Sequence, residues 1–269
     1  MTKSLLARHE KFFFHKEPFP HLCIVDALEN SLYQKLVWEF PSDTDIIKDH
    51  IDTGNSRFHL HGHEILEKTK NKALSDFVNY HCSPLFLKEF LTAFKPSIQE
   101  YYPEAKKWIN ESHLNTGIQF QDDIENKDVV LNCMACINSI PKDRVKSVRS
   151  AHIDLPDKLY TGLFYLKDPN DDGEGGDLNL YSFKKGLDHS YRSRKENDLL
   201  GMGEIPLELL HLEKTIRYSS NMFVIFLNTP HSIHGVTPRK NAAHSRRFFC
   251  VTAKFNHDMF RLSTFQKTS

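Results

Sequence analysis

The stretch His152-Ile153-Asp154 lies in a segment, residues 150–155, that we expect to be a β-strand. Successive side chains of a strand point to opposite faces, so His152 and Asp154 can both face the interior while Ile153 turns outward. The backbone of one strand would then present two neighbouring ligands to a single metal ion.

A third ligand is expected from a downstream segment, His231-Ser-Ile-His-Gly-Val-Thr-Pro238. His231 and His234 compete for this role. We favour His234, because the glycine that follows it lets the backbone approach a metal closely; His231 is then a candidate pocket residue. Two neutral imidazoles and one carboxylate on one face of an octahedron leave three positions open, which is the arrangement associated with non-haem Fe(II) oxygenases.

An arginine pair opens the last predicted strand, residues 246–255. An arginine at the entrance of an apolar strand needs a partner, and its planar fork matches a carboxylate, so a bound dicarboxylic acid would suit it. Only one of Arg246 and Arg247 can point inward, because neighbouring side chains face opposite ways. We favour Arg246, whose face carries smaller polar groups, over Arg247. Arg239, in the preceding loop, is a weaker candidate.

From about residue 128 the sequence changes to short apolar, β-rich runs separated by turn residues. With no long helices between them, such runs predict antiparallel strands that close into a sandwich or barrel. The expected strands cover residues 129–137, 150–155, 161–166, 177–183, 215–218, 222–228, 232–236 and 246–255.

The N-terminal part has mainly helical periodicity. Apolar residues recur at helical spacing over residues 32–40, where Pro41 ends the run. A second helix is expected over residues 71–80, and Pro84 can open a third over residues 85–94. Ahead of all three, residues 18–26 have the pattern of an extended strand that enters the fold.

We expect one domain, residues 1–269, because no linker, repeat or low-complexity tract separates the helical part from the strands. Residues 1–127 would form a supporting region of helices and strand, packed outside a β core formed by residues 128–256. The long segment 184–213 would be an insertion between strands, either a lid over the site or a solvated loop.

The overall charge is balanced. Lys plus Arg number 35 and Asp plus Glu number 35, so no net charge steers the chain toward nucleic acid or an anionic membrane. No apolar run has the length of a membrane span, and the start of the chain lacks the apolar stretch of a secretory signal. The odd number of cysteines, five, fits reduced thiols. We expect a soluble, cytoplasmic protein.

Two clusters of chemically active side chains are predicted to be surface features. His59-Leu-His-Gly-His63 lies in a polar stretch without a nearby carboxylate or cysteine at strand spacing, which favours a solvated loop. A basic cluster in the insertion would be the nearest thing to a nucleic-acid face, but a solvated loop is the simpler interpretation. Its members are Lys184, Lys185, Arg192, Arg194 and Lys195.

Taken together, these motifs resemble the Fe(II)/2-oxoglutarate-dependent dioxygenase superfamily, in particular its prolyl-4-hydroxylase-like branch. The resemblance rests on the metal triad, the arginine of the last strand and three further stretches. These stretches are Asp154-Leu-Pro-Asp-Lys-Leu-Tyr-Thr-Gly-Leu-Phe-Tyr-Leu166, Gly175-Gly-Asp-Leu178 and Asn228-Thr-Pro-His-Ser-Ile-His-Gly-Val-Thr-Pro238.

The resemblance implies a mainly β fold with N-terminal helices around a double-stranded β-helix core of the jelly-roll or cupin-like type. It implies Fe(II) held by His152, Asp154 and His234, with 2-oxoglutarate bound to the metal and to the arginine. Asn132, Asn138 and Tyr165 are further candidates for the pocket, beside His231 and Arg239.

The expected reaction is hydroxylation of an unactivated C–H bond of a small-molecule, amino-acid or sugar-like substrate, with 2-oxoglutarate and O2 converted to succinate and CO2. Related members that halogenate lack the carboxylate ligand, and Asp154 is present here. Desaturation, cyclisation or epimerisation with the same cofactors is the alternative, as is a non-catalytic cupin-like metal-binding module. No oligomeric state is predicted.

Overall fold

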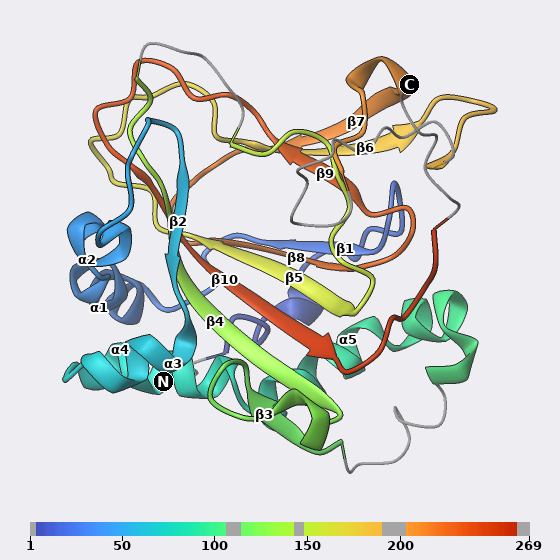
Figure 1. The fold of residues 1–269 in the computed structure, drawn as a ribbon, viewed down its shortest axis with the longest axis horizontal. Helices are drawn as coiled ribbons and strands as arrows, with labels where there is room; N and C mark the ends of the chain where they lie inside the picture. Colours follow the sequence, from blue (N-terminus) through green and yellow to red (C-terminus); the bar gives the residue numbers. More distant parts are fainter. Residues whose placement is uncertain (1–3, 106–113, 143–147, 190–202, 263–269) are drawn as a thin grey trace.

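Two β-sheets face each other, and helices of the N-terminal part pack outside the larger sheet (Figure 1). The computed structural model describes residues 4–105, 114–142, 148–189 and 203–262. The architecture is the double-stranded β-helix with N-terminal helices that the sequence predicted. Within the described ranges, no helix is both long and apolar enough to cross a membrane.

The larger sheet has the strand order β1-β8-β5-β10-β4-β2, with β3 pairing in parallel with β4 and the other pairs antiparallel. The smaller sheet has the order β7-β6-β9 and is antiparallel. The strands are β1 (His21–Ile24), β2 (Arg57–Leu60), β3 (Thr116–Ile118), β4 (Val129–Asn138), β5 (Lys158–Tyr165), β6 (Leu178–Phe183), β7 (Leu210–Ile216), β8 (Met222–Leu227), β9 (Ile233–Val236) and β10 (Arg246–Phe255).

The three predicted helices are present. Two of their ends follow the proline signals: Pro41 comes just after the first helix, and Pro84 opens the last one, which runs past its predicted end to Tyr101. The helices are α1 (Asn30–Glu39), α2 (Asp43–Ile47), α3 (Gly62–Lys68), α4 (Lys72–His81) and α5 (Pro84–Tyr101). Short 3-10 turns cover His9–Lys11, Pro103–Ala105, Ile124–Asn126 and Leu207–Leu209.

The alternation of side chains along β10 divides the apolar core into two layers. Phe249 and Val251 point toward the helices, where the Phe249 ring lies 4.9 Å from that of Phe77 in α4. Phe248 and Cys250 point the other way, into the space between the two sheets. The space that holds the candidate site is therefore lined by the inner faces of both sheets.

The predicted strand over residues 150–155 is wrong. Only His152 forms a β-bridge, to His234, and its neighbours are bonded elsewhere. The carbonyl of Ala151 accepts a hydrogen bond from the Ile205 amide, and the Ser150 amide donates to the Glu204 side chain. These bonds interrupt the regular pairing on the N-terminal side of the bridge, where the Val236 amide bonds to the Arg149 carbonyl.

Two other predictions need correction. Strand β7 (Leu210–Ile216) takes up the end of the predicted insertion and the first half of the strand predicted over residues 215–218. The segment His59–His63 is not a loop: it contains the end of β2, which pairs with β4, and the start of α3. Of the basic cluster, Arg192, Arg194 and Lys195 lie outside the described residues, as does much of the predicted lid.

Candidate metal centre

The structure brings His152, Asp154 and His234 together from two segments. One ligand atom of each lies within 4.8 Å of the others, and all three residues are buried. The backbones of His152 and His234 exchange two hydrogen bonds of 2.9 Å. A Cβ on Gly235 would come within 3.0 Å of the Ala151 amide nitrogen. The glycine therefore lets β9 approach the segment that carries His152, rather than the metal itself.

Both imidazoles are held in the tautomer that leaves Nε2 free to bind a metal. His152 Nδ1 lies 2.7 Å from the Ser150 carbonyl oxygen, and His234 Nδ1 lies 2.9 Å from that of Ser232. A carbonyl only accepts, so each Nδ1 carries the proton and each Nε2 keeps its lone pair. Burial lowers the pKa of both histidines, that of His152 well below its usual value, so both are neutral at physiological pH.

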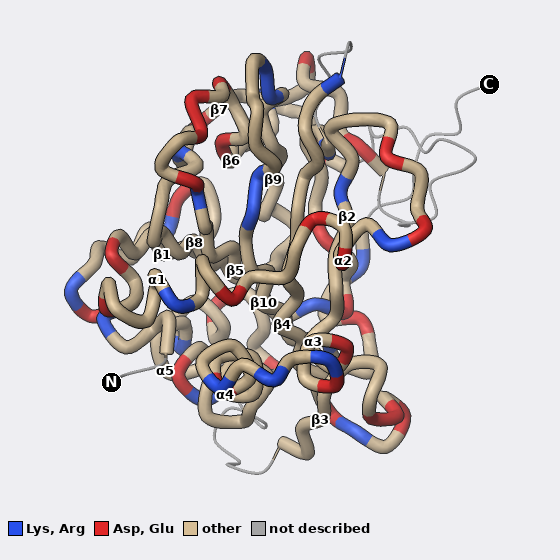
Figure 2. Tube along the Cα trace, turned by 90° about the vertical axis from the view of Figure 1, so that its left-hand side faces the viewer, with Lys and Arg blue, Asp and Glu red and all other residues tan. Residues whose placement is uncertain are grey.

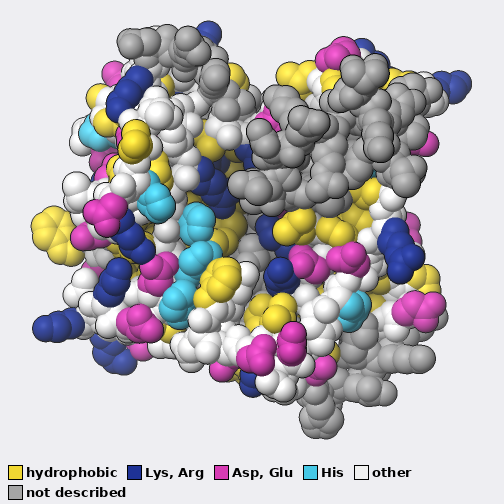
Figure 3. All heavy atoms as spheres, viewed as in Figure 1, with side chains coloured by type: hydrophobic (Ala, Val, Ile, Leu, Met, Phe, Trp, Pro, Cys, Tyr) yellow, Lys and Arg dark blue, Asp and Glu magenta, His cyan; other side chains and the backbone are white. Residues whose placement is uncertain are grey.

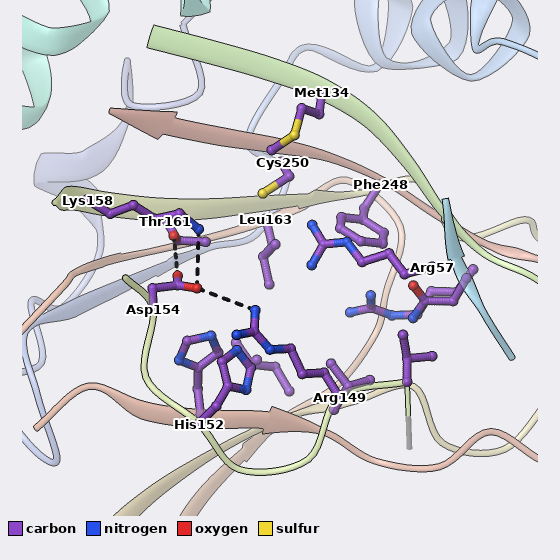
Figure 4. Close-up of a pocket in the computed structure, with 16 residues that line it drawn as sticks. Arg57, Met134, Arg149, His152, Asp154, Lys158, Thr161, Leu163, Phe248 and Cys250 are labelled. Atoms are coloured by element: carbon purple, nitrogen blue, oxygen red, sulfur yellow. Dashed lines mark hydrogen bonds and ion pairs between the residues drawn. The ribbon is translucent and has the colours of Figure 1, made fainter. Parts of the chain in front are cut away.

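Asp154 is ionised and surrounded by donors. Thr161 Oγ1 donates a hydrogen bond of 2.6 Å to its Oδ2, while Lys158 Nζ and Arg149 Nη1 lie 3.2 and 3.8 Å from its Oδ1 (Figure 4). Burial opposes ionisation, but the charge of Lys158 and the other nearby cations hold the pKa of Asp154 well below its ordinary value. The carboxylate is thus ready to bind a cation at neutral pH.

The hydrogen bond from Thr161 fixes the orientation of the Asp154 carboxylate. We expect Thr161→Val, which keeps the shape and removes the donor, to weaken metal binding about 10–100-fold, because groups that orient a ligand have effects of this size. Equilibrium dialysis against Mn(II) would measure it. Thr252→Val is the matched control, since Thr252 is a buried threonine opposite Thr161 on β10. Equal affinity for the two variants would contradict this role.

The two candidate arginines point in opposite directions. Arg247 turns outward, where its Nη2 lies 2.9 Å from Asp43 of α2. Arg246 turns into the space between the sheets and lines the same pocket as the three metal-site residues. The order of side chains along β10 therefore places Arg246, as favoured from the sequence, on the side of the candidate metal site.

Arg246 is buried, and no described residue supplies a counter-ion for it. Its side chain is only 1% exposed, and its Nε and Nη2 have no hydrogen-bond partner among the described residues. Its guanidinium carbon lies 4.8 Å from the ring centre of Tyr165, 5.0 Å from that of Tyr218 and 4.7 Å from that of Phe248. Aromatic faces stabilise a cation only in part, and an unpaired buried charge is costly. An anionic ligand would complete this site.

Sequence reasoning missed three cationic residues that line the pocket. Arg57 enters from β2, Arg149 from the segment before His152, and Lys158 from the start of β5 (Figure 4). Lys158 belongs to the sequence motif that follows Asp154, but the sequence did not indicate that its side chain lines the pocket. Arg57 and Arg149 lie in polar stretches in which basic residues are ordinarily solvated, so their sequence gave no signal.

Of the other pocket candidates, Asn138 lines the pocket, and its buried Oδ1 has no partner in the described part of the chain. Tyr165 is not part of the pocket lining, but its ring packs against the guanidinium of Arg246. The Asn132 side chain is instead occupied by the Gly62 amide, His61 and Gln119. His231 is exposed and outside the pocket lining.

Arg239 forms a buried ion pair with Asp171 instead of lining the pocket. It is 1% exposed, and its Nη2 lies 2.7 Å from both carboxylate oxygens of Asp171. The ion pair ties the loop after β9 to the loop before β6. This partner explains why Arg239, although near His234 in sequence, does not join Arg246 in the pocket.

We expect Asp171→Ala to lower the free energy of unfolding by about 3–5 kcal/mol, because it leaves the Arg239 charge buried and unpaired. Denaturant unfolding monitored by circular dichroism would measure the change. The matched control is Asp43→Ala, which removes the partially exposed pair with Arg247 and should cost less than about 1 kcal/mol. Similar small losses in both variants would show that the Asp171–Arg239 pair does not stabilise the loops.

No protein-family model and no curated protein matches the sequence. Among solved structures, a Pseudomonas putida prolyl-4-hydroxylase is similar with a TM-score of 0.47 and 12% identity, covering 94% of this chain and 99% of that one. A prolyl 4-hydroxylase from Phytophthora capsici has a TM-score of 0.46 and 16% identity, covering 95% and 63%. The epimerase SnoN, solved with Fe3+ and α-ketoglutarate, has a TM-score of 0.44 and 9% identity, covering 93% and 82%.

Proposed function

We propose that this protein is an Fe(II)- and 2-oxoglutarate-dependent oxygenase. The observation that carries the proposal is Arg246, a buried cation that has no counter-ion among the described residues and lines the same pocket as His152, Asp154 and His234. A metal site of this composition is compatible with several reactions. A metal site with a buried, unsatisfied guanidinium beside it is suited to a metal-binding dicarboxylic acid.

The residues fit the metal. His152 and His234 would bind through Nε2, since each Nδ1 is committed to a backbone carbonyl. Asp154 would bind through Oδ1, where the metal would replace the contacts with Lys158 and Arg149. Two imidazoles and one carboxylate form the facial set associated with non-haem Fe(II), which leaves positions for cosubstrate and O2. When bound, Fe(II) would activate O2 for oxidation of the substrate, and 2-oxoglutarate would be converted to succinate and CO2.

The rest of the pocket orients the reactants and excludes water. Arg246 would bind the distal carboxylate of 2-oxoglutarate through its planar fork, and the rings of Tyr165, Tyr218 and Phe248 around it strengthen that contact by keeping it dry. Apolar side chains also line the pocket, among them Met134 and Leu163. Such walls limit side reactions with solvent.

Hydroxylation of a small molecule is the outcome we propose. The carboxylate of Asp154 is present as a third ligand, and members of the superfamily that halogenate lack that carboxylate. We expect Fe(II)- and O2-dependent formation of succinate from 2-oxoglutarate, stimulated by the true substrate in a screen of metabolites. Succinate can be followed by mass spectrometry. The proposal fails if wild-type protein forms no more succinate than Asp154→Ala across the screen.

A further inference from the structure

The pocket around the candidate metal centre is strongly cationic. Four basic side chains line it, and Asp154 is the only acidic one in its described lining. The basic residues are Arg57, Arg149, Lys158 and Arg246. Over the whole chain, basic and acidic residues balance at 35 each, and they are interspersed along the side shown in Figure 2. Figure 3 shows Lys and Arg side chains inside the hollow of the face seen there.

The proposed cofactors would not neutralise this charge. The metal brings two positive charges and 2-oxoglutarate two negative ones, so they cancel. Arg246 is assigned to the cosubstrate. Arg149 and Lys158 lie near Asp154, and a dication bound to that carboxylate would repel both. An excess of positive charge on the walls of one pocket attracts an anion.

Arg57 is the basic residue best placed to bind a further anion. Its guanidinium lies 5.4 Å from the ring centre of Phe248, and its Nη2 is 3.7 Å from Cys136 Sγ. No carboxylate lies within ion-pair distance of it in the described part of the chain. Within the described residues, Arg57 therefore lines the pocket beside the Phe248 ring and the Cys136 thiol, without a carboxylate in ion-pair contact.

The strand register places Arg57 and Arg246 in one row. Asn138 of β4 is the partner of Arg57 on β2 and also of Arg246 on β10. Residues directly opposite each other on neighbouring strands share a face, so all three point into the pocket. Since neighbouring strands are about 4.8 Å apart, the Cα atoms of the two arginines are separated by about 10 Å. The two arginines therefore enter the pocket from different strands, on either side of Asn138.

We propose that the primary substrate is a small molecule with a carboxylate or phosphate group, and that Arg57 and Arg149 bind this group. The inference rests on the proposed function and names the substrate class of the same pocket. Guanidinium groups bind both kinds of oxyanion through paired N–H donors. The buried amide of Asn138, between the two arginines, would hydrogen-bond the substrate next to its anionic group.

Binding of matched compounds tests the proposal without turnover. Protein loaded anaerobically with Fe(II) and 2-oxoglutarate is titrated with amino acids and their amides in one arm, and with sugar phosphates and their free sugars in the other. Perturbation of the visible absorption of the complex reports binding. We expect at least one anion to bind, and its neutral counterpart to bind at least about tenfold more weakly, because each charge-assisted hydrogen bond contributes about 1.5–3 kcal/mol. Whether the tightly bound anion is an amino acid or a sugar phosphate shows whether the pocket recognises a carboxylate or a phosphate group.

Substitutions of the two arginines test whether they bind the anionic group of the substrate. Arg57→Gln and Arg149→Gln should each weaken binding of the anion at least about tenfold and leave the affinity for 2-oxoglutarate within about twofold, whereas Arg247→Gln, on the outer face of β10, should change neither. The proposal is overturned if neutral counterparts bind equally well, if both variants keep wild-type affinity, if Arg57→Gln loses 2-oxoglutarate instead, or if no anion binds. If wild-type protein forms no complex with Fe(II) and 2-oxoglutarate, the proposed function itself has failed.

Discussion

His152→Ala and Asp154→Ala should each weaken the affinity for Fe(II) by more than about 100-fold. This effect is larger than that expected for a residue that only orients a metal ligand. His152→Ala removes a neutral donor whose lone pair is directed by the Ser150 carbonyl. Asp154→Ala removes the one anionic ligand and leaves Lys158 and Arg149 without that counter-charge. Anaerobic titration with Fe(II), followed by metal analysis after gel filtration, measures the loss.

His231→Ala is the matched control for these variants. His231 lies three residues before His234 and is exposed outside the pocket, so its loss should leave Fe(II) affinity unchanged. Wild-type affinity in both His152→Ala and Asp154→Ala, with all proteins folded by circular dichroism, would place the metal elsewhere. A loss in His231→Ala alone would reverse the choice between the two histidines.

Arg246→Gln should weaken binding of 2-oxoglutarate at least about 30-fold, because removing one partner of a buried charge pair costs about 2–5 kcal/mol. The same change should leave the melting temperature of the ligand-free protein unchanged or raise it. The wild-type guanidinium has no counter-ion in the described structure, so its removal relieves an unpaired buried charge. Calorimetric titration of Mn(II)-loaded protein measures the affinity.

Arg247→Gln tests the alternative arginine. Its guanidinium contacts Asp43 on the outer side, so we expect wild-type affinity for 2-oxoglutarate. If Arg247→Gln lost affinity for 2-oxoglutarate and Arg246→Gln kept it, the cosubstrate would bind on the opposite face of β10 from the one proposed. The main support for the proposed function would then be removed.

The parts of the fold with strong local signals were predictable. Strand β10 has the predicted bounds, and the order of polar and apolar residues along it identified the inward arginine. The helix α1 was found from its periodicity and its terminating proline. The segment His231–Pro238 yielded β9 and the favoured histidine, because it combines a strand with a glycine that permits close backbone contact.

The rest depends on partners distant in the sequence. The four residues of β2 form a strand because they pair with β4. The sequence Arg57-Phe-His-Leu60 alone does not predict that pairing. The place of Arg57 in the pocket lining follows from the same pairing. Conversely, residues 150–155 have a strand-like pattern, but their backbone groups bond to Ile205 and Glu204, which sequence could not foresee.

Anaerobic addition of Fe(II) and 2-oxoglutarate to the wild-type protein, monitored by visible absorption spectroscopy, decides whether the metal and the dicarboxylic acid share this pocket. We expect a metal-to-ligand charge-transfer band that requires both additions. It should be absent in Asp154→Ala and should need at least about 30-fold more 2-oxoglutarate in Arg246→Gln. A wild-type protein without the band, or a band that persists unchanged in both variants, would contradict the proposed function.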